Sequence, residues 1–194
     1  MGARSSFLIS AAGSLSTHAS PPFPSLPSPS RTNTLRRIWY VNEERHLITP
    51  VINPVVLEKM QEAQLIVYGM GSLWTSIMPC LLLAGTGKAI AAHEGRKVLL
   101  LNGQTDRESG DMDAKDMIKA MTRVIATNEG GAARDGFLPL LSLITDVLVP
   151  RGTQIHVDYE QLRSLGLVVE EVASDDVGFF DSDALVAALI ERCK

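Results

Sequence analysis

Residues 65–76 read LIVYGMGSLWTS, and this stretch decides the fold expected of the 194-residue chain. The four apolar residues from Leu65 to Tyr68 favour a buried strand, and glycines 69 and 71 follow it directly. A helix is expected to follow, from about Thr75 to His93. An apolar strand, a glycine loop and a helix in this order are typical of a parallel sheet covered by helices on both faces.

The rest of the chain continues this alternation. Further strands are predicted at residues 38–41, 97–101, 146–149 and 167–169, and further helices at 54–62, 113–127, 159–165 and 181–193. We therefore expect an α/β fold with a mainly parallel sheet. Ligands of such sheets bind outside the carboxyl ends of the strands, so the loops after Tyr68 and Leu101 are the first candidate sites.

Composition excludes several classes of protein. The formal net charge is −4, so no basic excess is present to hold a nucleic acid through its phosphates. The two cysteines are too few for a disulfide framework. Residues 65–87 carry no charge and are long enough to span a bilayer, but four glycines and Pro79 interrupt them. A strand, a loop and a buried helix explain this stretch, and we expect no membrane partner.

The first part of the chain differs from the rest. No Asp or Glu occurs before residue 43, and five of the ten prolines lie between Pro21 and Pro29. We predict a disordered Ser/Pro-rich leader over residues 1–34 and a domain over residues 36–194. The leader has the composition of a transit peptide, which would direct a soluble protein to a chloroplast or mitochondrion rather than leave it cytoplasmic. A low-complexity tail, or untranslated sequence included in a gene model, is the alternative.

The loop after the first quoted strand is the strongest candidate for a binding site. Glycines 69 and 71 let the backbone turn sharply and approach a ligand closely, while Ser72, Thr75 and Ser76 add hydroxyl donors. The helix expected to begin here would add N–H groups and a dipole that favour an anion. These features predict a cradle for a phosphate or diphosphate. Tight packing of the strand against the helix is the alternative explanation for the glycines.

This loop matches neither of two common nucleotide motifs. The dinucleotide fingerprint GxGxxG would require glycine where Trp74 stands. Residues 85–88, GTGK, look like part of a P-loop, but that motif would also require glycine at Leu82 and a hydroxyl residue at Ala89. The prediction of a phosphate site therefore rests on residues 69–76.

Residues 102–110, NGQTDRESG, form the second candidate loop. Asn102 is suited to hydrogen-bond a sugar or base, and Arg107 to face a phosphate. Asp106 and Glu108 are candidates for a catalytic base or for Mg²⁺ ligands. A solvated loop with internal turns is the alternative.

At these two loops the chain resembles a known family. Residues 63–79, AQLIVYGMGSLWTSIMP, are similar to the ADLIVxGPGSLYTSIxP stretch of the family of gluconeogenesis factor YvcK and 2-phospho-L-lactate transferase CofD. Met70 stands where bacterial members usually have proline. Residues 97–102, KVLLLN, with residues 106–109, DRES, resemble a strand and loop that often read KVLLLN and DRET in eukaryotic members. The resemblance extends from about Arg36 to Ala188.

The resemblance implies a Rossmann-like, three-layer fold that binds a nucleotide diphosphate. Transferase members of the family move a phospholactyl group from a guanosine diphosphate-linked donor to a deazaflavin, usually with Mg²⁺, whereas regulatory members bind UDP-sugars. The GSLxTS form of the loop is more similar to the regulatory branch. The residues that the resemblance places along the phosphate-binding cleft are Gly69, Gly71, Ser72, Leu73, Thr75, Ser76 and Asn102.

These observations favour a nucleotide-diphosphate-binding protein of regulatory type. Phospholactyl transfer is the first alternative, for which Asp106 and Arg107 are the candidate catalytic residues, and a non-catalytic interaction module is the second. Family members begin with a strand and a GGGTG loop, which residues 1–34 do not contain. We therefore expect the chain to correspond to the C-terminal portion of the family fold. An apolar sheet edge left open in this way would favour association, and a homo-oligomer is the expected result.

Overall fold

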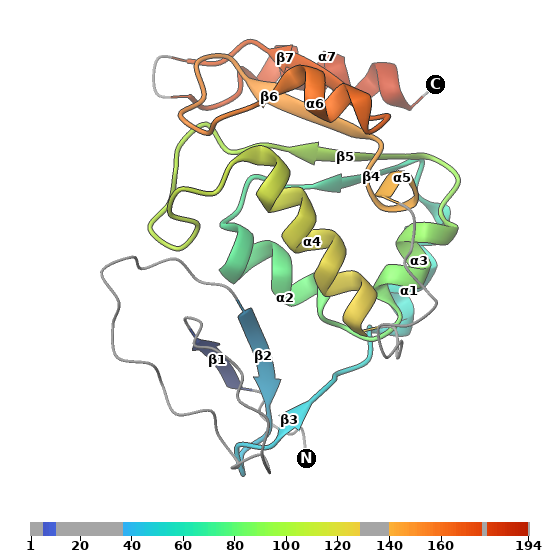
Figure 1. Cartoon of the computed structure of the whole chain (residues 1–194). Coiled ribbons are helices and arrows are strands. Elements are labelled where there is room, and N and C mark those ends of the chain that lie inside the picture. Colours follow the sequence, from blue (N-terminus) through green and yellow to red (C-terminus); the bar gives the residue numbers. More distant parts are fainter. Residues whose placement is uncertain (1–5, 11–36, 129–139, 176–177, 194) are drawn as a thin grey trace.

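The computed structural model describes residues 6–10, 37–128, 140–175 and 178–193. Its centre is a parallel sheet whose strands lie in the order β4 (Leu65–Tyr68), β5 (Arg96–Leu100), β6 (Asp146–Pro150) and β7 (Val168–Val172) (Figure 1). Each strand pairs with the next one along the chain. The carboxyl ends of all four therefore lie at one edge of the sheet, and the predicted α/β fold with a parallel sheet is confirmed.

Most of the other regular structure in the described residues is helical. They are α1 (Pro54–Glu62), the π-helical turn η1 (Leu73–Ile77), α2 (Met78–Leu81), α3 (Thr86–Ala92), α4 (Ala114–Asn128), α5 (Leu140–Leu143), α6 (Tyr159–Ser164) and α7 (Ser182–Arg192). Asn53, Asp113 and Asp181 each accept a backbone N–H in the first turn of the helix that follows, as expected of N-caps. No helix within the described ranges has the length and apolarity needed to cross a bilayer.

The sheet separates two hydrophobic cores, as three layers require. Leu99 and Val147 belong to the larger core, which also contains buried side chains of α2, α3, α4 and α6. Val98 and Leu148, next to them along the strands, belong to a smaller core with α7. Adjacent residues of a strand point to opposite faces, so the continuous apolar runs in β5 and β6 serve both cores.

The single helix expected from Thr75 to His93 is wrong. The chain instead forms η1, α2 and α3, with a break at Gly85, whose φ of +94° lies in the left-handed region. A left-handed residue cannot continue a right-handed helix, and glycine adopts this conformation without a Cβ penalty. The backbone N–H of Ala84 donates to Pro50 O, and that of Ile52 donates to Ala84 O, so the break also fixes the segment before α1.

A smaller antiparallel sheet precedes the parallel one in the chain. It consists of β1 (Ser6–Ser10), β2 (Arg37–Val41) and β3 (Leu47–Ile48), in that order. The hydroxyl of Tyr40 donates to Pro79 O at 3.2 Å, which joins β2 to α2. Residues 6–10, which lie within the predicted leader of residues 1–34, pair with β2. The rest of the predicted leader lies outside the described residues.

Candidate functional site

The two candidate loops meet at the carboxyl edge of the sheet. Ser72 Oγ lies 2.5 Å from Glu108 Oε2, and Thr75 Oγ1 lies 3.0 Å from the same oxygen. Both hydroxyls therefore donate to one carboxylate oxygen, although 36 residues separate Ser72 from Glu108. We call Ser72, Thr75 and Glu108 the hydroxyl–carboxylate cluster. Hydroxyls that hold a carboxylate oxygen have the geometry needed to hold a phosphate oxygen.

A tight turn in the second loop positions Glu108. Asp106 Oδ1 accepts the backbone N–H groups of Glu108 at 2.8 Å and Ser109 at 2.6 Å, and Asp106 O accepts that of Gly110. An aspartate oxygen that accepts the backbone N–H two residues later forms an Asx turn, which fixes the backbone locally. Asp106 is thus a structural residue of the turn. The side chain of Arg107 is exposed and makes no ion pair with another described residue.

Two residues that are close to the cluster in the sequence each have a buried polar atom without a hydrogen-bond partner among the described residues. The atoms are Trp74 Nε1, in a residue 4% exposed, and Ser109 Oγ, in a residue 1% exposed. Buried polar atoms are nearly always paired in native proteins, so an unpaired one requires an explanation. One such atom occurs in each of the two candidate loops. A polar ligand or an ordered water molecule would supply the missing partners.

The other residues of the first loop have different surroundings. Gly69 is exposed and has open space where a Cβ would lie, whereas a Cβ on Gly71 would come 2.6 Å from Ser76 Cβ. Leu73 is 6% exposed and belongs to the larger core, so it anchors the loop instead of presenting a side chain to a cleft. Ser76 is exposed, and its backbone N–H donates to Ser72 O. Close packing therefore explains Gly71 and leaves Gly69 available for contact with a ligand.

Tyr68, the last residue of β4, fixes the start of this loop. Its hydroxyl donates to Leu143 O at 2.6 Å, and the side chain is buried in the larger core. Burial raises the pKa of the Tyr68 hydroxyl well above its usual range, because the ionised form would lose its hydration. Tyr68 is therefore a neutral packing residue and not a candidate base.

The sequence did not predict a polar cavity that lies at the same edge. It has a volume of about 280 Å³, and its lining includes Gly103, Arg151, Gln154 and Ser174. Gln154 N donates to Gly103 O at 2.8 Å, and Thr153 Oγ1 donates to Asn102 O at 2.9 Å. Asn102 therefore lies where the loops after β5 and β6 join. The polar run RGTQ directly after the buried strand β6 is the signal that would have identified this cavity.

The cluster also bears on the expected Mg²⁺ ion. Its donors are one carboxylate and two hydroxyls, all hard oxygen ligands of the kind that Mg²⁺ takes together with substrate phosphates. No group of three or more His, Cys, Asp or Glu side chains suited to a metal occurs in the described part of the chain. One carboxylate does not make a metal site by itself, so the binding of Mg²⁺ stays a prediction.

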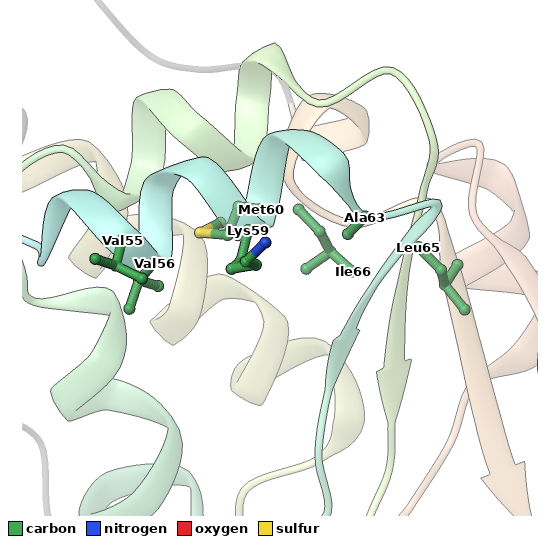
Figure 2. Close-up of a pocket in the computed structure, with 7 residues that line it drawn as sticks. All are labelled: Val55, Val56, Lys59, Met60, Ala63, Leu65 and Ile66. Atoms are coloured by element: carbon green, nitrogen blue, oxygen red, sulfur yellow. The ribbon is translucent and has the colours of Figure 1, made fainter.

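An apolar groove lies away from this edge, between α1 and β4 (Figure 2). It has a volume of about 310 Å³, and Val55, Val56, Met60 and Ile66 contribute to its lining. Val55 is 59% exposed and Val56 is 47% exposed. β4 pairs with β5 on one side only, so its other side is an open edge of the described sheet. Exposed apolar side chains beside an open strand are typical of a surface that another polypeptide covers.

The fold and the site together define an α/β protein with a candidate anion site at the carboxyl edge of a parallel sheet. The family model described as 2-phospho-L-lactate transferase CofD matches residues 28–177. The chain therefore belongs to the CofD/YvcK family.

Similar curated proteins come from yeast and bacteria. The chain is 30% identical over 159 residues to the uncharacterized protein YNL011C of Saccharomyces cerevisiae, covering 78% of this chain and 35% of that protein. It is 27% identical over 163 residues to the gluconeogenesis factor of Bacillus subtilis, covering 81% of this chain and 48% of that protein. It is 45% identical over 151 residues to the gluconeogenesis factor of Listeria innocua, covering 70% of this chain and 44% of that protein. The chain thus spans less than half the length of each of these relatives.

A solved structure confirms the fold. The crystal structure of protein BH3568 from Bacillus halodurans superimposes with a TM-score of 0.61 and 21% sequence identity, over 81% of this chain and 51% of that chain. A second structure of BH3568, described as a member of the UPF0052 family, gives the same TM-score. This similarity supports the expected Rossmann-like arrangement of the sheet and its helices.

Proposed function

We propose that this protein binds a nucleotide diphosphate, such as a UDP-sugar or a GDP-linked compound, with the diphosphate held at the first candidate loop. The observation that carries this proposal is the convergence of the Ser72 and Thr75 hydroxyls on one anionic oxygen. The unpaired polar atoms of Trp74 and Ser109 support it, because a bound polar ligand would provide partners. The name gluconeogenesis factor, borne by two of the relatives described above, is consistent with a regulatory role.

Calorimetric titration with UDP-N-acetylglucosamine and with GDP tests the proposal. We expect binding of at least one of them, weakened about tenfold in Ser72→Ala, since hydrogen bonds to charged groups contribute about 1.5–3 kcal/mol. Ser164→Ala is the matched control, because Ser164 is an exposed serine on α6 whose hydroxyl donates only to Gln161 O. Absence of heat with both ligands, from protein shown by circular dichroism to be folded, would refute the proposal.

Phospholactyl transfer is the specific reaction that the family description suggests for the same site. It is tested by Mg²⁺-dependent turnover of a guanosine diphosphate-linked donor. Arg107→Ala is the informative variant, because Arg107 is exposed and its removal leaves the turn intact. Asp106→Ala is a poor choice, because it removes the acceptor of two backbone N–H groups and would disturb the turn in any case.

A second candidate function is interaction with another polypeptide, favoured by the apolar groove beside β4. The occupant that we propose is a second copy of the chain, which would cover Val55 and Val56. Sedimentation velocity tests this: Val56→Lys should shift a dimer toward monomer, whereas Val186→Lys, an exposed valine on α7, should not. A wild-type chain that remains monomeric at tens of micromolar would exclude this candidate and leave the binding proposal untouched.

A further inference from the structure

The carboxylate of Glu108 occupies the place that the proposed function assigns to a phosphate. Ser72 Oγ and Thr75 Oγ1 lie 2.5 Å and 3.0 Å from Glu108 Oε2. A hydroxyl has one hydrogen to donate, so each of these donors is already used by the protein itself. A phosphate oxygen cannot accept the same two hydrogen bonds until the carboxylate leaves.

Electrostatics opposes simultaneous occupancy as well. Glu108 and a diphosphate are both anionic, and like charges a few ångströms apart repel strongly near a protein surface. The nearest cation in sequence, Arg107, is exposed and makes no ion pair with Glu108 or with another described residue. Arg107 therefore does not offset the repulsion.

From these contacts we propose that Glu108 is an intramolecular competitor of the nucleotide diphosphate, an autoinhibitory contact that closes the site until the ligand displaces it. This inference rests on the proposed function and concerns the same loop. Because Asp106 fixes the turn that presents Glu108, the carboxylate is held next to the hydroxyls at a high effective concentration. A ligand must therefore overcome this internal anion in addition to binding.

The position of Ser109 is consistent with such an opening. Ser109 follows Glu108 directly, is 1% exposed, and has a hydroxyl without a partner among the described residues. The closed state leaves this hydroxyl unpaired at a free-energy cost, which the open state with ligand can recover.

The Glu108→Gln variant distinguishes a carboxylate that competes with the ligand from one that helps to bind it. The amide keeps the shape of the side chain, removes its charge, and accepts a weaker hydrogen bond than a carboxylate does. With UDP and inorganic pyrophosphate as probes and EDTA present, we expect this variant to bind about tenfold more tightly than wild type, as removal of one nearby like charge predicts. Glu58→Gln, an exposed glutamate on α1, is the matched control and should bind as wild type does.

Trp74 provides the readout. In a Trp39→Phe background it is the remaining tryptophan, and it belongs to the same loop as Ser72 and Thr75. Titrations followed by its fluorescence give the dissociation constants, and thermal unfolding of each variant confirms that it is folded.

The outcomes separate the two proposals. Tighter binding by Glu108→Gln supports the competitor role. Equal binding by wild type and Glu108→Gln refutes that role and leaves the binding function standing. Weaker binding by Glu108→Gln, in EDTA or after addition of Mg²⁺, also refutes it, because Glu108 would then assist the ligand directly or through the metal. Absence of binding by every variant refutes both proposals.

Discussion

Arg192 Nε lies 2.9 Å from Asp146 Oδ1, and both side chains are buried, at 7% and 1% exposure. This pair joins the end of α7 to the first residue of β6. Arg192 also donates to Glu170 Oε2 on β7, and Arg96 at the start of β5 reaches the other oxygen of Asp146. Asp146 therefore connects three elements at the amino edge of the sheet, opposite the candidate site.

The first prediction concerns this pair. Asp146→Asn leaves the guanidinium of Arg192 buried without its full counter-charge, so we expect the free energy of unfolding to fall by about 3–5 kcal/mol. Urea titration measures the change. Glu62→Gln, which breaks the exposed Lys59–Glu62 pair, is the control and should cost less than about 1 kcal/mol. Similar losses in both variants would show that burial does not determine the effect.

The second prediction concerns the approach of two glycines. A Cβ on Gly103 would lie 1.8 Å from Gly178 O, a backbone atom that cannot rotate away. We expect Gly103→Ala to destabilise the protein by about 1–3 kcal/mol, as overpacking does, and to distort the polar cavity. Gly69→Ala meets open space and should leave the urea midpoint almost unchanged. A stable Gly103→Ala variant would mean that the two loops separate easily.

The third prediction concerns the hydroxyl–carboxylate cluster in the absence of ligand. Ser72 and Glu108 are in direct contact, so their effects on stability should not be additive. A double-mutant cycle of Ser72→Ala and Glu108→Ala should give a coupling energy of about 0.5–1.5 kcal/mol. The cycle of Ser164→Ala with Glu108→Ala should give none. Additivity in both cycles would argue that the contact is not formed in solution.

The fourth prediction concerns pH. The raised pKa of Tyr68 means that the folded protein keeps this proton at a pH where the unfolded chain, with a tyrosine pKa of about 10, loses it. Its contribution to stability is present below pH ~10 and is lost as the pH rises above that value. Tyr68→Phe should therefore be less stable at pH 8, by about 1 kcal/mol for the lost hydrogen bond to Leu143 O, but less sensitive to alkali.

Urea midpoints of both proteins between pH 8 and pH 11 test this prediction. Burial lowers the pKa of Lys97, which gives a pH dependence of opposite sign, but Lys97 is present in both proteins and cancels in the difference. Urea midpoints that change with pH in parallel for the two proteins would contradict a raised pKa of Tyr68.

Much of the sheet could be predicted from the sequence because its strands are continuous apolar runs. The runs ending at Tyr68 and Leu101 mark β4 and β5 to within a residue. The helix break at Gly85 could not be predicted in this way, because the apolar residues around it keep helical spacing while one left-handed backbone angle ends the helix. Local pattern describes side chains, and it carries little information about a single dihedral angle.

The candidate site was predicted in its parts but not in its contacts. The sequence predicts both Ser72 and Glu108 as candidates, since each loop follows a strand and the ends of parallel strands share an edge. That Glu108 would accept the hydroxyl of Ser72 depends on the turn made by Asp106, which is a matter of three-dimensional geometry. The close contact of Gly103 with Gly178 was missed for the same reason, because 75 positions separate them in the chain.

The order of the strands has a consequence for how the chain is made. A ribosome releases a protein from its amino end, and domains tend to form in that direction. In the order β4-β5-β6-β7, every strand that emerges meets the free edge of the strand made just before it. The sheet can therefore grow by addition at one side during synthesis, without waiting for a distant segment. Arg192, near the end of the chain, emerges after these strands. Its ion pairs with Asp146 and Glu170 then join α7 to β6 and β7.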